Sequence, residues 1–556
     1  MNGESLWRTP SEADAMMKPP RLWMGFAFGW SLVFWVCGVG IPLGALISEA
    51  ARGEVGRHLW DPVVLGVARM TLKQAIWSTF FSGGLGLVLG LWVGRLTLGR
   101  TFDRVLSLMA LPMSVPTVVA ALAWVFWMGR SGFLASWGAE LGVRLDWAYS
   151  FKAVILAHAF YNIPWVALCV AHARRMVPVA QLEALATLGA GRLSVFYQGV
   201  WPYVRWSWAA ACAQVMGLCS MSFALVLVLG GGPPVQTLET EVYARLRYGA
   251  LDLTGALACA FWELILTLLP WGMVLFFERR EKVKVRQTVK RSVPVSFLDW
   301  EGPMFRSTPN RVFRPLVFGV GVFFLVPYLP IFFGRFTEVR GDLSSALLWR
   351  ALRLSLSLSF VSSVLTLLTA FLVLTVMSQA TVGPRGRSVL SVLFNLPSGL
   401  SVIILGLGLW IAYGRWTDPF GGAPALMILL QMTLFFPLAL SVLSPVASAT
   451  DSKQMEAAMS LGASWVSAWW EVEWVRWKGP VLMAFGSVFG GCLGEVGAVT
   501  LFASDQWVSL PLLISRSMQR YHFGQAQTLA ALLLGCVFVI TLGANEIGQR
   551  ISRTKS

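Results

Sequence analysis

The chain has 556 residues, of which 56% are hydrophobic and only 13% are charged, and its net charge at pH 7 is +16. This composition excludes a soluble globular protein, because a folded soluble chain of this length keeps far more charge in contact with water. Most of the basic residues fall in loops on one side of the apolar runs. That is the positive-inside pattern of a membrane protein, so we predict no nucleic-acid partner.

Apolar runs follow one another from the N-terminus onward, and about twelve of them approach the roughly 20 residues that cross a bilayer as a helix. Clear examples are Leu22–Ile47, Ala153–Ala171, Leu253–Phe277 and Leu365–Met377. The runs are continuous and do not alternate with period two, which favours helices over a barrel. We therefore predict an all-α integral membrane protein with about 12 transmembrane helices. It would lie in the lipid of the inner membrane with both termini in the cytoplasm.

The most basic loop, residues 278–314, falls near the middle of the chain. It separates six predicted helices from another six. We therefore expect a first membrane half over residues 1–277, a cytoplasmic linker over 278–314 and a second half over 315–556. An ordinary cytoplasmic loop without any repeat would have the same composition, so the division depends on likeness between the halves.

Three internal correspondences favour a repeat. Leu111-Pro112 in the third apolar run corresponds to Leu396-Pro397 in the ninth, and each is followed by an apolar stretch that ends in Trp. Two loops of the form Glu-Ala-x follow the fourth and tenth predicted helices. Each is followed by an apolar helix and then by an outside loop that ends in an aromatic-rich turn, Tyr243–Tyr248 and Arg516–His522. Internal repeats of this length are how many transporters are built, with the pathway between the two repeats.

The two Glu-Ala-x loops are Glu183-Ala-Leu-Ala-Thr-Leu-Gly189 and Glu456-Ala-Ala-Met-Ser-Leu-Gly462. The residues before each Gly favour helix, and the Gly allows the backbone to turn sharply. An amphipathic pattern resumes after it. Each loop is thus expected to form two short helices joined by a tight turn, a shape suited to docking into a groove on a partner.

These loops resemble the Glu-Ala-Ala…Gly…Pro signature of permease subunits from binding-protein-dependent ABC importers. In the first copy Leu185 replaces the third-position Ala, and four residues match at the family's spacing: Glu183, Ala184, Gly189 and Pro202. In the second copy Val475 takes the Pro position, and the matching residues are Glu456, Ala457, Ala458 and Gly462. One such copy would be a weak signal, whereas two at corresponding places are specific.

Within that family the chain is most similar to the thiamine permeases, with the iron(III) permeases next. The first half carries this likeness in Ile155–Pro164 and Ser222–Pro233, and the second half carries it in Gly494–Val499 followed by Leu510-Pro511. The resemblance implies a type I importer permease fold in which two halves are fused into one chain. The separate binding protein largely selects the cargo in such importers, so the choice between thiamine and iron(III) stays open here.

The resemblance also implies the partners. Two copies of an ABC ATPase would grip the two loops, with Glu183 and Glu456 pairing with basic residues of the ATPase. A periplasmic or lipid-anchored binding protein would deliver the substrate on the other side. The sequence agrees with this division of labour, because the phosphate-binding pattern Gly-x-x-x-x-Gly-Lys-Ser/Thr occurs nowhere in it. We therefore expect a transport subunit that is not itself an enzyme.

Two acidic residues, Glu263 and Glu495, are assigned to membrane helices. An acid within lipid is costly and therefore a candidate for the substrate pathway, particularly for a cationic substrate. The alternative is a helix-to-helix hydrogen bond or a place at the membrane edge. The seven Cys and four His show no metal-ligand spacing, so neither a metal nor a cofactor is expected.

Two other classes compete with the importer hypothesis. A proton-coupled secondary transporter often has two six-helix halves, and Gly94–Arg100 faintly resembles the major-facilitator loop, although Leu98 stands where that motif has Asp. That class leaves the paired Glu-Ala-x loops unexplained. A membrane-embedded enzyme is the third class, and the sequence offers it no nucleophile-base pair.

Overall fold

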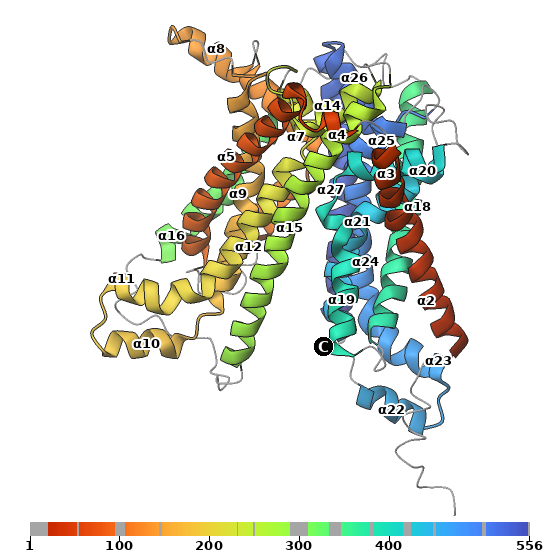
Figure 1. The fold of residues 1–556 in the computed structure, drawn as a ribbon. Helices are drawn as coiled ribbons and strands as arrows, with labels where there is room; N and C mark the ends of the chain where they lie inside the picture. The colour runs from red at the N-terminus through yellow and green to blue at the C-terminus, as the bar shows by residue number, and fades with distance from the viewer. Residues whose placement is uncertain are drawn as a thin grey trace, which may run out of the picture.

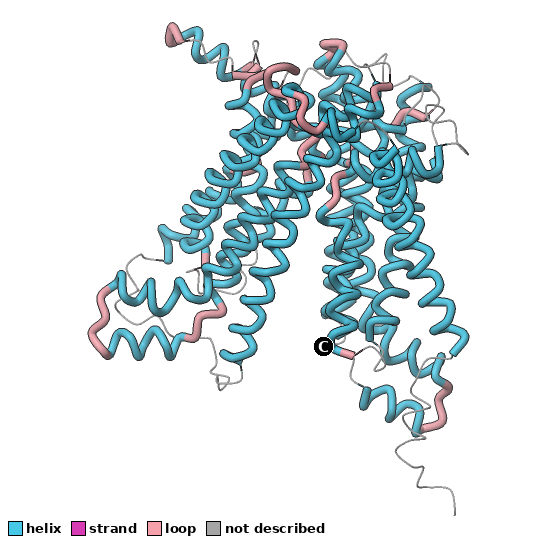
Figure 2. Tube along the Cα trace, in the orientation of Figure 1, coloured by secondary structure: helices cyan, strands magenta, loops and turns pink. Residues whose placement is uncertain are grey.

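The computed structural model describes residues 21–52, 55–94, 106–129, 132–143, 147–230, 232–247, 251–289, 310–332, 346–378, 383–414, 424–448, 452–502 and 507–553. Within these ranges every regular element is a helix (Figure 2). The all-α fold predicted from the continuous apolar runs is therefore confirmed.

Eight helices in the described ranges are long and apolar enough to cross a membrane. They are Leu22–Arg52, Pro62–Val93, Thr117–Glu140, Phe151–Arg175, Leu253–Glu281, Ala346–Ser378, Pro424–Ser448 and Phe523–Ser552. The pair Arg385–Gly399 and Val402–Tyr413, bent by 98°, makes a ninth if it is one broken span. The helices Trp201–Ser220 and Trp474–Gly494 and the shorter apolar helix Phe318–Phe332 pack among these. Together they agree with the expectation of about twelve.

The same helices occur in the same order in both halves of the chain. The matching pairs are α5 (Pro62–Val93) and α18 (Ala346–Ser378), α7 (Thr117–Met128) and α20 (Val402–Tyr413), α9 (Phe151–Arg175) and α21 (Pro424–Ser448), α12 (Trp201–Ser220) and α24 (Trp474–Gly494), and α15 (Leu253–Val289) and α27 (Phe523–Arg553). Pro112 and Pro397 each lie in a one-turn 3₁₀ helix, η2 (Leu111–Ser114) and η6 (Leu396–Gly399), before α7 and α20. The repeat expected from the sequence is thus present in the fold.

A buried hydrogen bond repeats in register as well. The N–H of Leu238, at the start of α14 (Leu238–Arg247), donates to Thr71 Oγ1 at 2.9 Å. The N–H of Leu510, at the start of α26 (Leu510–Gln519), donates to Ser355 Oγ at 2.8 Å. Because Thr71 and Ser355 occupy the same position in α5 and α18, the two halves share a register residue by residue.

Two helical bundles meet at one end of the molecule and diverge towards the other (Figure 1). One contains α5, α9, α12 and α15, and the other contains α18, α21, α24 and α27. Pairs of short helices project at the diverging end: α10 (Val179–Thr187) and α11 (Arg192–Ser194) from the first bundle, α22 (Ser452–Ser460) and α23 (Trp465–Ala468) from the second. The end of the chain marked C lies on that side too.

The first helix of each half packs against the other half. In α2 (Arg21–Trp35), Trp30 Nε1 donates to Thr369 Oγ1 of α18 at 3.0 Å, and α3 (Ile41–Arg52) lies along α20. In return α16 (Asn310–Phe323) lies beside the first bundle (Figure 1). Just after α16, the carbonyl of Pro327 accepts a hydrogen bond from Trp127 Nε1 of α7 at 3.1 Å. This exchange of first helices holds the two halves together, and the hydropathy pattern does not predict it.

Two expectations differ in detail from the structure. The segments Tyr243–Tyr248 and Arg516–His522, expected as turns, lie largely in the helices α14 and α26. The boundary at residue 277 falls within α15, which continues to Val289, and the domain boundaries stay a prediction. Residues 290–309 of the expected linker and 95–100 of the Gly94–Arg100 segment lie outside the described residues.

Close packing in the first bundle depends on small residues. A Cβ at Gly90 of α5 would lie 2.6 Å from the carbonyl oxygen of Ala167 and 2.6 Å from Cβ of Val170, both on α9. Gly84, on the same helix, has nothing within 4 Å of a Cβ. The contrast provides a matched pair of positions for testing this contact.

We expect Gly90→Leu to destabilise the folded protein by about 1–3 kcal/mol, because the added side chain must push α5 and α9 apart. Gly84→Leu adds the same atoms at an open position and gains helix propensity, so its stability should not fall. Thermal unfolding of the two purified variants measures the difference. Equal midpoints for both variants would contradict this account of the packing.

Candidate functional site

The first Glu-Ala-x loop forms the α10–α11 projection. Pro178 precedes α10, whose Gln, Leu, Glu and Ala residues favour helix. After α10 the N–H of Ala190 donates to Leu185 O and the N–H of Gly189 to Ala186 O, both at 3.0 Å. Gly189 has a φ of +72°. This is a Schellman-type helix end, which requires a left-handed residue and explains the Gly.

The second loop repeats this arrangement in α22 and α23. The N–H of Ala463 donates to Ala458 O at 3.2 Å, and the N–H of Gly462, at φ +94°, donates to Met459 O at 3.0 Å. In both halves the second short helix runs on into a π-helical segment, η3 (Val195–Val200) and η8 (Trp469–Glu473), and then into α12 or α24. The two short helices and the tight turn expected from the sequence are therefore present in each half.

Each projection exposes three apolar side chains at matching positions. Leu188, Leu193 and Tyr197 form what we call the first docking surface. The second docking surface consists of Leu461, Val466 and Trp470. Leu188 is 83% exposed and Leu461 89% exposed, and each directly follows the first short helix of its projection, α10 or α22 (Figure 1). Exposed leucines at a projecting end are typical of a surface that another protein covers.

A polar side chain fastens each projection to the membrane helix that follows it. In the first half Tyr203 of α12 donates its hydroxyl to Gln181 Oε1 of α10 at 2.8 Å. In the second half Arg476 of α24 donates to Gln454 Oε1 of α22 at 2.5 Å. The two pairs occupy matching positions, so a force on either projection reaches α12 or α24 directly. The sequence analysis did not predict this contact. The two partners are 22 positions apart, and neither is one of the Glu, Ala and Gly residues that define the motif.

The residues of the Glu-Ala-x motif lie where a partner can reach them. Glu183 is half-buried and Glu456 is exposed, and the neighbouring Ala184 and Ala457 are exposed. Ala458 is half-buried. Pro202 is the second residue of α12, and Val475 takes the same place in α24. The helix starts in both cases, so Val at this position does not disturb the exit from the second loop.

The candidate acids of the pathway lie at the interface between the halves. Glu263 is a fully buried residue of α15. Glu495, which we expected within a membrane helix, instead follows the end of α24 in extended backbone, where it accepts the Gly497 N–H at 2.7 Å. A third acid, Glu239 of α14, is also fully buried and faces Glu263. Sequence reasoning missed Glu239 because the outside loop to which it had been assigned folds back into the protein as α14.

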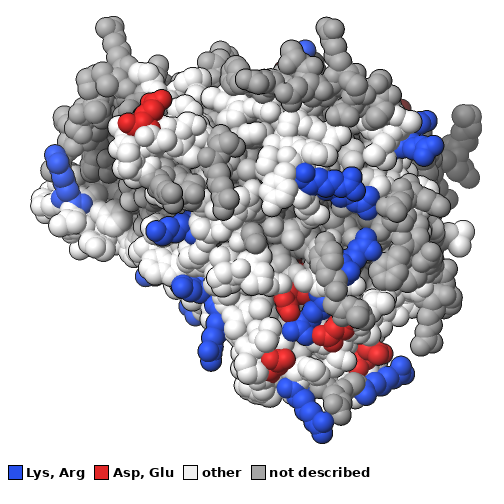
Figure 3. Space-filling view, turned by 90° about the horizontal axis from the view of Figure 1, so that it is seen from above, with Lys and Arg blue, Asp and Glu red and all other residues white. Residues whose placement is uncertain are grey.

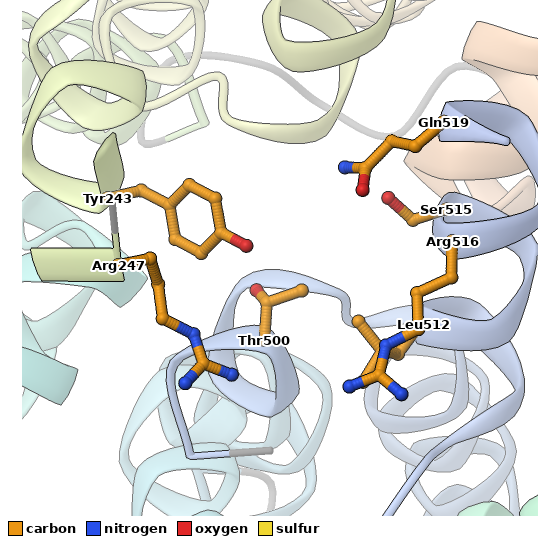
Figure 4. A pocket seen from close by; sticks show the side chains of 7 residues that line it. All are labelled: Tyr243, Arg247, Thr500, Leu512, Ser515, Arg516 and Gln519. Atoms are coloured by element: carbon orange, nitrogen blue, oxygen red, sulfur yellow. The ribbon is translucent and has the colours of Figure 1, made fainter. Parts of the chain in front are cut away.

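A cavity of about 290 Å³ opens between the halves near the end opposite the docking surfaces. Tyr243 and Arg247 of α14 face Thr500 of α25 (Gly497–Phe502) and residues of α26 across it (Figure 4). The α26 residues are Leu512, Ser515, Arg516 and Gln519. Both signs of charge are present on this end of the molecule (Figure 3).

Residues 86–283 and 371–551 match the family described as binding-protein-dependent transport system inner membrane component. The two matched ranges fall in the two halves and together cover more than half of the chain. The chain therefore belongs to this family, and it is a multi-pass inner-membrane permease subunit of an ABC importer.

Individual relatives cover nearly the whole chain. The thiamine transport system permease protein ThiP of Brucella abortus is 29% identical over 559 residues, with 98% of each chain covered. The protein of the same description from Escherichia coli is 26% identical and covers 86% of this chain and 89% of its own. The sulfate transport system permease protein CysT of Escherichia coli, 28% identical, covers 43% of this chain but 87% of its own length. A single permease unit that is matched over most of its length thus covers less than half of this chain, as expected if two such units are fused here.

The left-handed Gly of the first loop gives a local test. Gly189→Ala should destabilise the end of α10 by about 1–2 kcal/mol, because a Cβ is unfavourable at positive φ. Gly191→Ala is the matched control, since Gly191 has a φ of −66° and equally open surroundings. Hydrogen exchange at the amides of residues 188–190 should accelerate only in Gly189→Ala. Equal exchange in both variants would contradict the role given to the left-handed residue.

Proposed function

We propose that this chain is the membrane subunit of an ATP-driven thiamine importer, and that its two docking surfaces bind two copies of the ATPase. The observation that carries the proposal is the combination of full-length likeness to thiamine permeases with two matching projections. Nucleotide binding by the ATPase pulls the projections together, and the pairs Tyr203–Gln181 and Arg476–Gln454 pass that movement to α12 and α24.

Glu183 and Glu456 pair with basic residues of the ATPase and set its orientation on each projection. Within the described residues neither carboxylate is engaged in an ion pair that would compete with this contact. A charged pair at the rim of an interface contributes more to orientation than to affinity, so the apolar docking surfaces supply most of the binding.

The projections mark the cytoplasmic side in this proposal, because the ATPase is there. Both termini then lie in the cytoplasm, since α2 begins and α27 ends on the side of the projections (Figure 1). The opposite end, with α14, α26 and the cavity between them, faces a periplasmic or lipid-anchored binding protein. Membrane lipid covers the exposed apolar side chains of the long helices, such as Phe80 and Val88 of α5.

Thiamine is favoured over iron(III) because relatives that cover 98% and 86% of this chain are described as thiamine permeases. The sulfate permease matches about half of the chain, which reflects the shared permease unit. A proton-coupled secondary transporter has no need of the paired projections.

Charge on the docking surfaces tests the ATPase contact. Leu188→Asp and Leu461→Asp should each weaken binding of the ATPase by about 10–100-fold, because burial of one Leu contributes about 1.5–3 kcal/mol. The amount of ATPase that co-purifies with the detergent-solubilised permease measures this binding. Leu141→Asp, at an exposed Leu that follows α8 (Phe133–Glu140) on the opposite end, is the control and should bind normally. Normal ATPase recovery with both docking variants would overturn the assignment of these surfaces.

Transport itself tests the substrate. Cells that lack their own thiamine uptake, and that express this chain with its ATPase and binding protein, should accumulate labelled thiamine. Uptake should depend on the ATPase and should persist when the proton gradient is collapsed while ATP is maintained. Accumulation of iron(III) in place of thiamine would favour the alternative cargo, and loss of uptake with the proton gradient would favour the secondary class.

A further inference from the structure

Two acidic side chains are enclosed together at the interface between the halves. Glu239 of α14 and Glu263 of α15 are both fully buried, and the Ser401 hydroxyl of the second half faces them. The oxygens of both carboxyl groups lack a hydrogen-bond partner among the described residues. Glu495 lies near enough to add a further negative charge to the surroundings of Glu239.

The fold does not require these acids. In the matching helices of the second half, Glu239 corresponds to Pro511 of α26 and Glu263 corresponds to Leu533 of α27. Glu495 likewise corresponds to Ser222 of the first half. The same scaffold is therefore built without carboxylates at the matching places, and the two buried acids both belong to the first half.

An enclosed pair of this kind is unfavourable as it stands. Negative charge on either carboxyl group is poorly solvated in a medium of low dielectric and is repelled by charge on its neighbour. The unsatisfied oxygens of the pair also lose the hydration that they would have in water. A bound cation would relieve both costs, and a ligand that binds one conformation better shifts the protein towards it.

We propose that Glu239 and Glu263 form the site at which a monovalent organic cation rests between the two halves, with Glu495 adding to the negative potential there. The proposal rests on the proposed function, since thiamine carries one quaternary nitrogen. Negative charge on the carboxyl groups offsets the positive charge of the cation, so the cation can be held away from water at a lower cost.

The cavity at the outer end provides the approach. Tyr243, which lines it, is four residues after Glu239 on α14, so the two side chains lie one helical turn apart on the same face. On the other side of the cavity, Thr500 lies in α25, the short helix that begins just after Glu495. Arg247 and Arg516 make the cavity itself unfavourable for a cation, which therefore comes to rest at the carboxylates when the interface opens.

The test uses the full chain in lipid nanodiscs and three probes: thiamine, an N-benzylthiazolium as a simpler aromatic monocation, and thiochrome as an uncharged relative of thiamine. Both cations should raise the midpoint of thermal unfolding of the wild type, and thiochrome should not. Glu239→Gln and Glu263→Gln should weaken the response to the cations by about tenfold or more, because a charge-assisted contact is lost. Glu546→Gln, at a surface ion pair with Arg550, should respond like the wild type.

Glu263→Leu separates a binding role from a structural one, because Leu stands at the matching position of the second half. Its unfolding midpoint without ligand should equal or exceed that of the wild type, and its response to cations should be absent. A lower midpoint would assign Glu263 a structural role and overturn the proposal. A full cation response in the Gln variants, an equal response to thiochrome, or no response to either cation in the wild type would overturn it as well.

Failure of this site and failure of the proposed function give different results. If thiamine is transported and the two Gln variants transport it with unchanged KM, thiamine import stands and the carboxylate site is wrong. If the benzylthiazolium responds through Glu239 and Glu263 while thiamine is neither bound nor transported, the cation site stands and thiamine is the wrong cargo.

Discussion

Backbone hydrogen bonding in lipid is the constraint on which the rest of this structure depends. Without water, each N–H and C=O in the hydrocarbon region needs a partner in the protein, and continuous helices provide it. Helices can break only where protein covers the break. The interruptions before α7 and α20 and after α24 accordingly lie among residues shared by the two halves, where Ser401 Oγ accepts the Ile404 N–H at 3.1 Å. The breaks therefore place irregular backbone and polar side chains at the interface.

Because the two halves are repeats of one another, residues at matching positions can be compared across the interface. The halves agree closely where the fold needs them to agree, as in the hydrogen bonds from Leu238 to Thr71 and from Leu510 to Ser355. They also agree at the two projections, where helix ends, exposed apolar residues and Gln contacts recur. They differ at the buried acids, which only one side of the interface carries. Matching projections are what two identical partners would require, whereas acids on only one half of the interface are suited to a single small substrate.

Much of the fold and of the projections could be predicted from the sequence. Continuous apolar runs determine the spans, and Gly189 and Gly462 stand where the backbone must adopt positive φ. These signals are local, so they can be recognised without knowing which distant residues lie nearby. Glu263 was also recognised, because an acid inside an apolar run is conspicuous. The exchange of the first helices, the Gln181–Tyr203 contact and Glu239 were missed, since each depends on which distant surfaces meet.

The sequence by itself thus determined the membrane class, the repeat and the paired projections, because apolar run length, internal likeness and glycine positions act over a few residues. Only the tertiary structure decided that α2 and α16 cross to the opposite halves, and that Glu239 is buried beside Glu263. Helix exchange depends on side-chain fit between surfaces hundreds of residues apart, as between Trp30 and Thr369. The burial of Glu239 depends on α14 folding back between the bundles, which hydropathy does not record because α14 is itself polar in sequence.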